Sequence, residues 1–230
     1  QEFAYVASHD LQEPLRMVAS YVDLLAAEYG EDLDAEASEY MDFAVDGAER
    51  MQAMVDGLLE YARVQTRGED FDETDAEAVL ADTLQDLSMH LDEHDATVTH
   101  DALPRLDADA DQLGQLFQNL VKNAIEHGGE ATTVHVSAEA RDDTHLFRVS
   151  DDGPGIPRDQ HDRLFQLFQQ GNRDGDGTGI GLAVCERIVQ RHGGDIWIED
   201  GAETGATIAF TIPDRAGEEP LRFGTEVTER

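Results

Sequence analysis

Cysteine, lysine and long apolar runs are almost or entirely missing from this sequence. The single cysteine, Cys185, excludes an internal disulfide, and its apolar helical neighbourhood predicts a small buried side chain. No apolar run approaches the roughly 20 residues that a membrane-spanning helix needs, and no signal peptide is visible. We therefore expect a cytoplasmic segment without membrane contact. Because it starts at Gln1, without methionine, inside a helical pattern, we expect a fragment, with any membrane region lying upstream.

Basic residues are scarce: Lys and Arg total 16 against 51 Asp and Glu, which gives a formal net charge of -35. Lys122 is the only lysine. This charge excludes binding to nucleic acid or to an anionic membrane surface, because phosphate contacts need clustered cations. The acidity is typical either of a disordered acidic segment or of a folded protein from a high-salt cytoplasm, where salt screens self-repulsion. We favour the folded protein, because the acidic residues alternate with periodic apolar positions.

Residues 1–66 are expected to form two long helices. Apolar residues alternate spacings of four and three in both, which predicts a bundle seam, and the short polar link 29–32 predicts an antiparallel hairpin. One hairpin with a single apolar stripe cannot enclose a core, so we expect a four-helix bundle in a homodimer. The alternative is a monomeric hairpin packed on the rest of the chain. The stripe residues are Leu11, Leu15, Val18, Val22 and Leu25, then Ala37, Met41, Ala44, Ala48, Met51, Val55, Leu58 and Ala62.

After a polar linker at 67–72, the pattern of residues 73–213 predicts an α+β two-layer sandwich, with helices on one face of a mixed sheet. Residues 214–230 are expected to be a polar, frayed tail. Helices are expected after a capping box formed by Thr74 and Glu77, after the cap Asp109, and over 180–191. Strands are expected at 96–99, 133–138, 145–150, 196–199 and 206–212.

The first segment that could take part in chemistry surrounds His9 on the first expected helix. Asp10 follows it directly, and Pro14 cannot donate the helical hydrogen bond to the Asp10 carbonyl, which predicts a bend just after His9. A carboxylate that holds one imidazole nitrogen protonated makes the other nitrogen a nucleophile. On its own, this pattern more often belongs to an ordinary solvated surface histidine.

A second segment, the helix around Asn119 and Asn123, places two carboxamides four residues apart on one face. Lys122 and Glu126 flank that face. The pair could be plain surface asparagines. However, the only lysine lies between them, and carboxamide oxygens suit Mg²⁺ while lysine suits phosphate.

A third segment, Asp151–Pro157, directly follows an expected strand and contains Gly153 and Gly155. Glycines let the backbone approach a flat ligand, and a carboxylate at a strand end can accept a hydrogen bond from an exocyclic amine. The alternative is an ordinary turn, because Asp, Gly and Pro all favour turns.

A fourth segment is rich in glycine, with Gly177, Gly179 and Gly181 at the start of a helix, where backbone amides bind anions. It is no P-loop, because no Lys-Ser/Thr follows, and a flexible loop without ligand is the alternative. Before it, Phe165 and Phe168 are expected three apart on a helix face, either as core or as an anchor for a glycine flap.

Together and in this order, these segments resemble the sensor histidine kinase family over about residues 1–213. His9 matches the H box, Asn119 and Asn123 the N box, Asp151 with its glycines the G1 box, and the later phenylalanines and glycines the F and G2 boxes. The resemblance implies a dimerisation and phosphotransfer hairpin followed by a Bergerat-type ATP-binding domain.

The resemblance also implies roles for individual residues. His9 would be the phosphoacceptor, oriented and deprotonated by Asp10, Asn123 would coordinate Mg²⁺, Asp151 would bind the adenine amine, and 160–178 would be the ATP lid. The implied ATP-binding residues are Asn119, Lys122, Asn123, His127, Asp151, Gly153, Gly155, Ile156, Phe168, Gly177, Thr178, Gly179, Gly181, Leu182 and Thr207.

The local run 8–16 is similar to the H box of phytochrome-associated and PAS-linked kinases, and the acidic, lysine-poor composition resembles haloarchaeal proteins. Glu13 stands where many kinases that are also phosphatases carry Asn or Thr. The resemblance implies ATP-dependent phosphorylation of His9 and transfer to an aspartate of a response-regulator receiver domain. The alternatives are another Bergerat-type ATPase, which would lack His9 on a bundle helix, and a non-catalytic dimeric signalling scaffold, which would not need the intact set of boxes.

Overall fold

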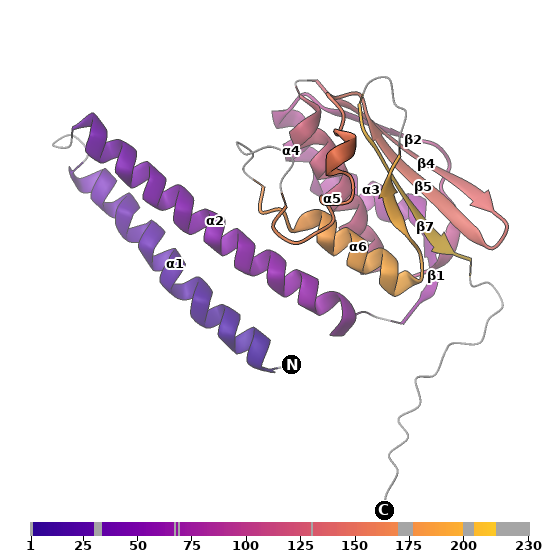
Figure 1. The fold of residues 1–230 in the computed structure, drawn as a ribbon, viewed down its shortest axis with the longest axis horizontal. Helices are drawn as coiled ribbons and strands as arrows, with labels where there is room; N and C mark the ends of the chain where they lie inside the picture. The colour runs from indigo at the N-terminus through magenta and orange to yellow at the C-terminus, as the bar shows by residue number, and fades with distance from the viewer. Residues whose placement is uncertain are drawn as a thin grey trace, which may run out of the picture.

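The computed structural model shows a helical hairpin followed by an α/β sandwich (Figure 1). Helices α1 (Glu2–Tyr29) and α2 (Ala35–Thr66) run antiparallel, as the sequence predicted, and Asp34 begins α2 by accepting a hydrogen bond from the Ala37 amide at 2.8 Å. Pro14 lies inside α1. The structure describes residues 2–29, 34–66, 68, 70–129, 131–169, 177–199 and 205–214, but not the side chains of 2–11, 65 and 66.

The hairpin exposes many large apolar side chains in this single chain. Ala48 is buried between the helices, and the Gln12 side chain donates a hydrogen bond to Asp56 across them. Most of the larger apolar residues nevertheless face solvent, as expected for two helices that cannot enclose a core alone. The exposed ones are Met17, Val18, Tyr21, Leu24, Leu25, Tyr29, Tyr40, Phe43, Met51 and Leu58.

The α/β sandwich has one layer of helices and one layer of sheet. The sheet is mixed, as predicted, and has five strands in the order β2-β4-β5-β7-β6. Only β2 and β4 pair in parallel; the other neighbours are antiparallel. Helices α5 and α6 pack on this sheet and on each other, with α3 beside α5 (Figure 1). The strands are β2 (Thr97–His100), β4 (Thr133–Arg141), β5 (Thr144–Asp151), β6 (Ile196–Ile198) and β7 (Thr207–Pro213), and the helices α3 (Ala76–Asp86), α5 (Ala110–Gly128) and α6 (Gly181–His192).

The core between sheet and helices centres on three fully buried phenylalanines. Phe147 of β5 and Phe210 of β7 stack with ring centroids 4.9 Å apart, and Phe117 of α5 meets Phe147 edge-on at 6.1 Å. Cys185 is buried in α6, as expected, and burial raises the pKa of its thiol far above the usual value. This phenylalanine packing fixes α5 against the middle of β5 and β7.

The end of α2 packs directly on α6. A Cβ at Gly57 would come within 3.0 Å of Ile180, and the Arg187 guanidinium lies 5.3 Å from the Tyr61 ring centroid. The Gln112 side chain donates to the Val64 carbonyl at 2.9 Å. The hairpin therefore contacts the sandwich through α2, beside the residues that open α6.

A buried ion pair fixes the start of α5 to the end of α6. Asp109 caps α5, as predicted, by accepting from the Gln112 amide at 3.1 Å, and its other oxygen is 3.0 Å from Arg191. Its side chain is only 1% exposed. His192 accepts from the Asp109 amide through Nε2 at 3.2 Å.

Three predictions about local structure were wrong or incomplete. The cap of α3 is Asp75, not Thr74, whose hydroxyl instead donates to the Ala108 carbonyl at 3.0 Å. The short pair β1 (Asp72–Asp75) and β3 (Arg105–Ala108) and the short helix α4 (Ser88–Glu93) were not expected.

The predicted helix face for Phe165 and Phe168 is also wrong. A 3₁₀ turn over Arg158–Gln160 is followed by turns, so Phe165 is buried while Phe168 is 49% exposed. Across the described residues, no helix is both long and apolar enough to cross a membrane.

Candidate functional site

Helix α5 presents Asn119 toward the start of α6. One face of α5 is buried in the core, and the two asparagines lie half-buried at the edge of that face. The Asn119 amide nitrogen is buried and meets no strict hydrogen-bond geometry among the described residues, although the Asn119 side chain lies close enough to the Cys185 thiol to act as a weak donor to it. A Cβ at Gly181 would lie 3.6 Å from the Asn119 side-chain oxygen. A buried carboxamide NH₂ with only a weak sulfur acceptor nearby can donate to a stronger acceptor such as a phosphate oxygen.

The next turns of α5 carry the other polar residues predicted for the site. Asn123 lies one turn after Asn119 and is half-buried. Lys122 is half-exposed, with Nζ 3.5 Å from a Glu126 carboxylate oxygen. His127 lies close enough to Asp151 for its charge to lower the pKa of that carboxyl. The exposed side of α5 thus runs from Asn119 toward Asp151.

Asp151 ends β5, and backbone amides hold its carboxylate. Oδ1 accepts from the Gly153 amide at 3.0 Å and from the Ala206 amide at 3.1 Å. Within the described part of the chain, Oδ2 has no hydrogen-bond partner, so it remains able to accept from a ligand. Burial raises the pKa of Asp151 above its usual value, although the two amides act in the opposite direction.

The glycines after Asp151 allow close backbone packing. A Cβ at Gly153 would lie 2.6 Å from the Gly128 Cα, at the end of α5. Gly155 has φ +78°, and a Cβ there would meet the Gly205 carbonyl oxygen at 2.8 Å. Ile156 packs partly buried against the core. The turn therefore joins the end of α5 to the segment before β7, and neither glycine could carry a side chain unchanged.

Phe168 and Gly179 close the base of the predicted lid. The Phe168 amide donates to the Gly179 carbonyl at 2.9 Å, and their φ values are +64° and +67°. A Cβ at Gly179 would lie 2.6 Å from the Gln169 carbonyl oxygen, whereas one at Gly177 would meet nothing within 4 Å. Phe168 thus serves as an anchor through its backbone. The rest of the predicted lid, 170–176, lies outside the described residues.

Helix α6 begins without a side-chain cap. Its N-cap residue, Ile180, makes no side-chain hydrogen bond to the first turn, which includes Gly181 and Leu182. The first amides of a helix have no intrahelical acceptor and carry partial positive charge, so this end suits an anion. Thr178, Gly181 and Leu182 are each half-buried beside it.

These features lie along one helix at a nucleotide-sized separation. Asn119 contacts the start of α6, and Gly128 contacts the turn after Asp151. At 1.5 Å per residue, the nine residue steps from Asn119 to Gly128 span about 13 Å. That length suits a ligand with an anionic end at α6 and an amine-bearing end at Asp151.

One predicted site residue, Thr207, is not brought to this region by the described contacts. The Thr207 hydroxyl donates to Ser150 at 2.9 Å, and the two residues pair across β5 and β7, on the face of the sheet opposite to the Asp151 side chain. His9 and Asp10 lie on α1, but their side chains are outside the described ones, so the predicted bend and the hydrogen bond between them stay predictions.

The backbone partners of Asp151 were missed from the sequence. Ala206 supplies an amide to the carboxylate, and the Gly205 amide donates to the Gly153 carbonyl at 2.8 Å. The only signal was the glycine just before β7, which was not assigned a role. Gly128, at the end of α5, also meets this turn and had no role in the site assigned from the sequence.

Comparisons with known proteins agree with this architecture. The family model of the His Kinase A (phospho-acceptor) domain matches residues 1–67. The model of the histidine kinase-, DNA gyrase B- and HSP90-like ATPase matches residues 108–216. Cyanobacterial phytochrome A from Nostoc is 45% identical over 227 residues, covering 97% of this chain and 30% of the relative. Phytochrome-like protein Cph1 from Synechocystis is 39% identical over 93% of this chain and 29% of the relative. The chain thus spans less than a third of these relatives.

Other relatives and solved structures extend the comparison. Sensor histidine kinase WalK from Bacillus subtilis is 29% identical over a match that covers 95% of this chain and 37% of WalK. The structure of full-length ShkA in complex with AMPPNP superposes with a TM-score of 0.67 at 28% identity, covering 92% of this chain and 45% of ShkA. Because the phosphoacceptor and ATPase models match in series on the observed hairpin and sandwich, the chain belongs to the sensor histidine kinases and carries their transmitter core.

Proposed function

We propose that this chain binds ATP with Mg²⁺ and transfers the γ-phosphoryl group to its own His9. The observation that carries the proposal is the joint placement of three groups along α5. They are the Asn119 carboxamide, the half-buried Asp151 carboxylate and the start of α6, which has no side-chain cap. Each has the chemistry to bind one part of a nucleotide, and the phosphoacceptor hairpin precedes them in the chain.

The adenine end of ATP is assigned to the Asp151 region. Its carboxylate accepts the exocyclic amine, and the backbone turn through Gly153, Gly155 and Ile156 lies against the flat ring. Phosphates are assigned to the first turn of α6, where Gly181 and Leu182 present amides, and to the base of the lid at Gly177, Thr178 and Gly179. On α5, Asn119, Lys122 and His127 complete the phosphate contacts.

Asn123 is the residue proposed to hold Mg²⁺. A carboxamide oxygen is a hard ligand, and Mg²⁺ usually completes its octahedron with substrate phosphates and water rather than with a protein cage. One protein ligand is therefore enough. When bound, the ion offsets the negative charge of the transferring phosphates.

The proposed transfer places one nitrogen of the His9 imidazole in line with the γ-phosphorus. A nitrogen–phosphorus bond forms, the bond to the β–γ bridging oxygen breaks, and ADP leaves with the electron pair. Asp10 holds the proton of the other ring nitrogen and takes it up as the ring becomes positively charged. The phosphoryl group then passes to an aspartate of a response-regulator receiver domain.

The contacts between α2 and α6 must open for this transfer. Tyr61 with Arg187, and Gly57 with Ile180, connect the hairpin to the start of the proposed phosphate site. We infer that the linker at 67–72 lets the ATP-binding domain swing toward His9. A signal from an upstream sensor region would act by loosening these contacts.

The assembly proposed for the active protein is a homodimer in a high-salt cytoplasm. The exposed apolar residues of the hairpin support dimerisation, since a second hairpin would bury them in a four-helix bundle. The charge of -35 supports a salt-rich setting, because salt screens repulsion between carboxylates.

A labelling experiment tests this function. In molar KCl with γ-labelled ATP and Mg²⁺, the chain should gain an acid-labile, base-stable label. The variant His9→Gln should lose the label and keep nucleotide binding, while His100→Gln, at an exposed position of β2, should label normally. ATP hydrolysis without label would favour another Bergerat-type ATPase, and absence of nucleotide binding would favour a scaffold.

A further inference from the structure

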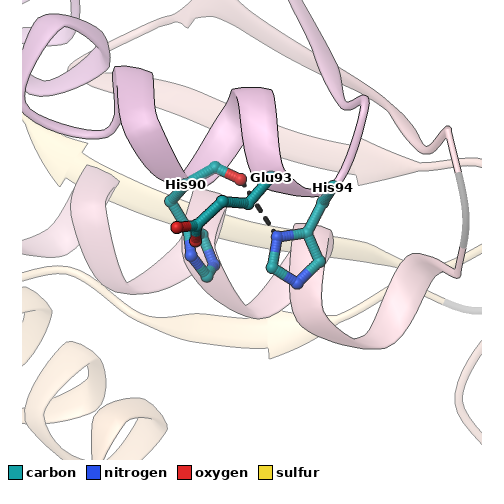
Figure 2. A group of neighbouring side chains, drawn as sticks. All are labelled: His90, Glu93 and His94. Carbon is teal, nitrogen blue, oxygen red and sulfur yellow. Dashed lines mark hydrogen bonds between the residues drawn. The ribbon is translucent and has the colours of Figure 1, made fainter.

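A compact histidine and glutamate cluster lies on α4, beside Glu126 of α5, whose carboxylate also pairs with Lys122. His90 and Glu93 are on the helix and His94 directly follows it, so spacings of three and four place them on one face (Figure 2). One ligand atom from each lies within 4.8 Å of the others. Across the described residues, no other group of three or more His, Cys, Asp or Glu side chains meets this condition.

His94 is oriented as a metal-binding histidine would be. Its Nδ1 lies 3.0 Å from the His90 backbone carbonyl, the bond drawn in Figure 2. A carbonyl only accepts, so Nδ1 carries the proton and Nε2 presents its lone pair. Metal-binding histidines commonly show this arrangement, in which one ring nitrogen donates to a backbone carbonyl and the other binds the ion.

His90 supplies an independent observation. Its Nε2 is buried yet has no hydrogen-bond partner among the described residues. The nearest carboxylate oxygen, from Glu126 of α5, is 3.7 Å away, too far for a hydrogen bond. The His90 and His94 rings lie with centroids 4.5 Å apart. A cation between these side chains would give the buried nitrogen a partner, and Glu126 would add a second nearby negative charge.

We propose that His90, Glu93 and His94 bind one divalent transition-metal ion of the Zn²⁺ type. Two imidazole nitrogens and one carboxylate are ligands of Zn²⁺ and its first-row neighbours, whereas Mg²⁺ prefers oxygen ligands. The site is therefore chemically distinct from the one assigned to Asn123. The His94 carbonyl also accepts a hydrogen bond from the Ala131 amide at 3.3 Å, which joins the end of α4 to the loop before β4.

Calorimetry with Zn²⁺ alone tests the site. The chelator-treated full chain, kept in saturating Mg²⁺ and without nucleotide, should bind one Zn²⁺ per chain in a step distinct from weak surface binding. The variants His94→Gln and Glu93→Gln should weaken that step by at least about tenfold. Glu93 is exposed, so its variant should fold even if a histidine variant does not.

Matched controls separate the cluster from the acidic surface. His100→Gln and His135→Gln, in β2 and β4, should leave Zn²⁺ binding unchanged. Co²⁺ should give visible absorption in the wild-type chain that the His94→Gln variant loses. If Glu93→Gln and His94→Gln bind Zn²⁺ as tightly as the wild type, the proposal is wrong. Because no nucleotide is present, this outcome is independent of the kinase proposal.

Discussion

Gly177 and Gly179, two glycines of the G2 box, should respond differently to substitution by alanine. At Gly179, alanine must adopt φ +67°, which costs roughly 1–2 kcal/mol for a non-glycine residue. Its Cβ would also lie 2.6 Å from the Gln169 carbonyl oxygen, so the bond between the Phe168 amide and the Gly179 carbonyl must lengthen or break, at about 1 kcal/mol. At Gly177 a Cβ meets nothing within 4 Å.

If the bound nucleotide needs the Phe168–Gly179 contact, the free-energy cost of Gly179→Ala lowers the affinity for ATP. About 2–3 kcal/mol corresponds to a roughly 30- to 150-fold weaker Kd for ATP. Gly177→Ala should change it by less than about threefold, equivalent to about 0.6 kcal/mol. Titration calorimetry with a non-hydrolysable ATP analogue, in molar KCl and Mg²⁺, measures both. Equal affinities for the two variants would refute the argument that the Phe168–Gly179 contact supports the nucleotide.

Three further variants or probes test other parts of the structure. Burial raises the Asp151 pKa, so the folded state holds that proton more tightly, and stability falls as pH rises from the unfolded value of about 3.9 through the higher folded one. The nucleotide-free Asp151→Asn protein should therefore unfold at or above the wild-type temperature at pH 7, while ATP binds about 100-fold more weakly because an amide NH₂ faces the adenine amine. Asp109→Ala removes the α5 cap and the carboxylate partner of Arg191, which keeps its bond to Gln112, and should cost about 2–3 kcal/mol in urea unfolding, more than Asp75→Ala at the cap of α3. Cys185 should react with a maleimide only after unfolding, because burial raises its pKa; rapid labelling of the folded chain would contradict that burial.

Long, strongly periodic elements could be predicted from the sequence. The apolar stripes specified α1 and α2, and Asp109 correctly marked the start of α5. The strands β1 and β3 could not be found, because each has four residues and β1 is almost entirely polar. They form by pairing with each other, which is a long-range interaction with no local pattern.

The error at Phe168 has a similar origin. Two phenylalanines three apart fit a helix, but a hydrogen bond to Gly179, eleven residues later, holds Phe168 at positive φ. Side chains of the site were predicted by their motifs, whereas the amides that hold Asp151 were not. Backbone groups are present at every residue, so only the fold selects Ala206 and Gly153 as donors.

Mapping of the phosphorylated residue tests the central claim most directly. Trypsin releases residues 1–16, in which His9 is the only histidine. After incubation with ATP and Mg²⁺, mass spectrometry at neutral pH should find one added phosphoryl group in this peptide, placed on His9 by fragmentation. A phosphoryl group on any other residue, or an unmodified peptide from chains that bind ATP, would contradict the assignment of His9 as the acceptor.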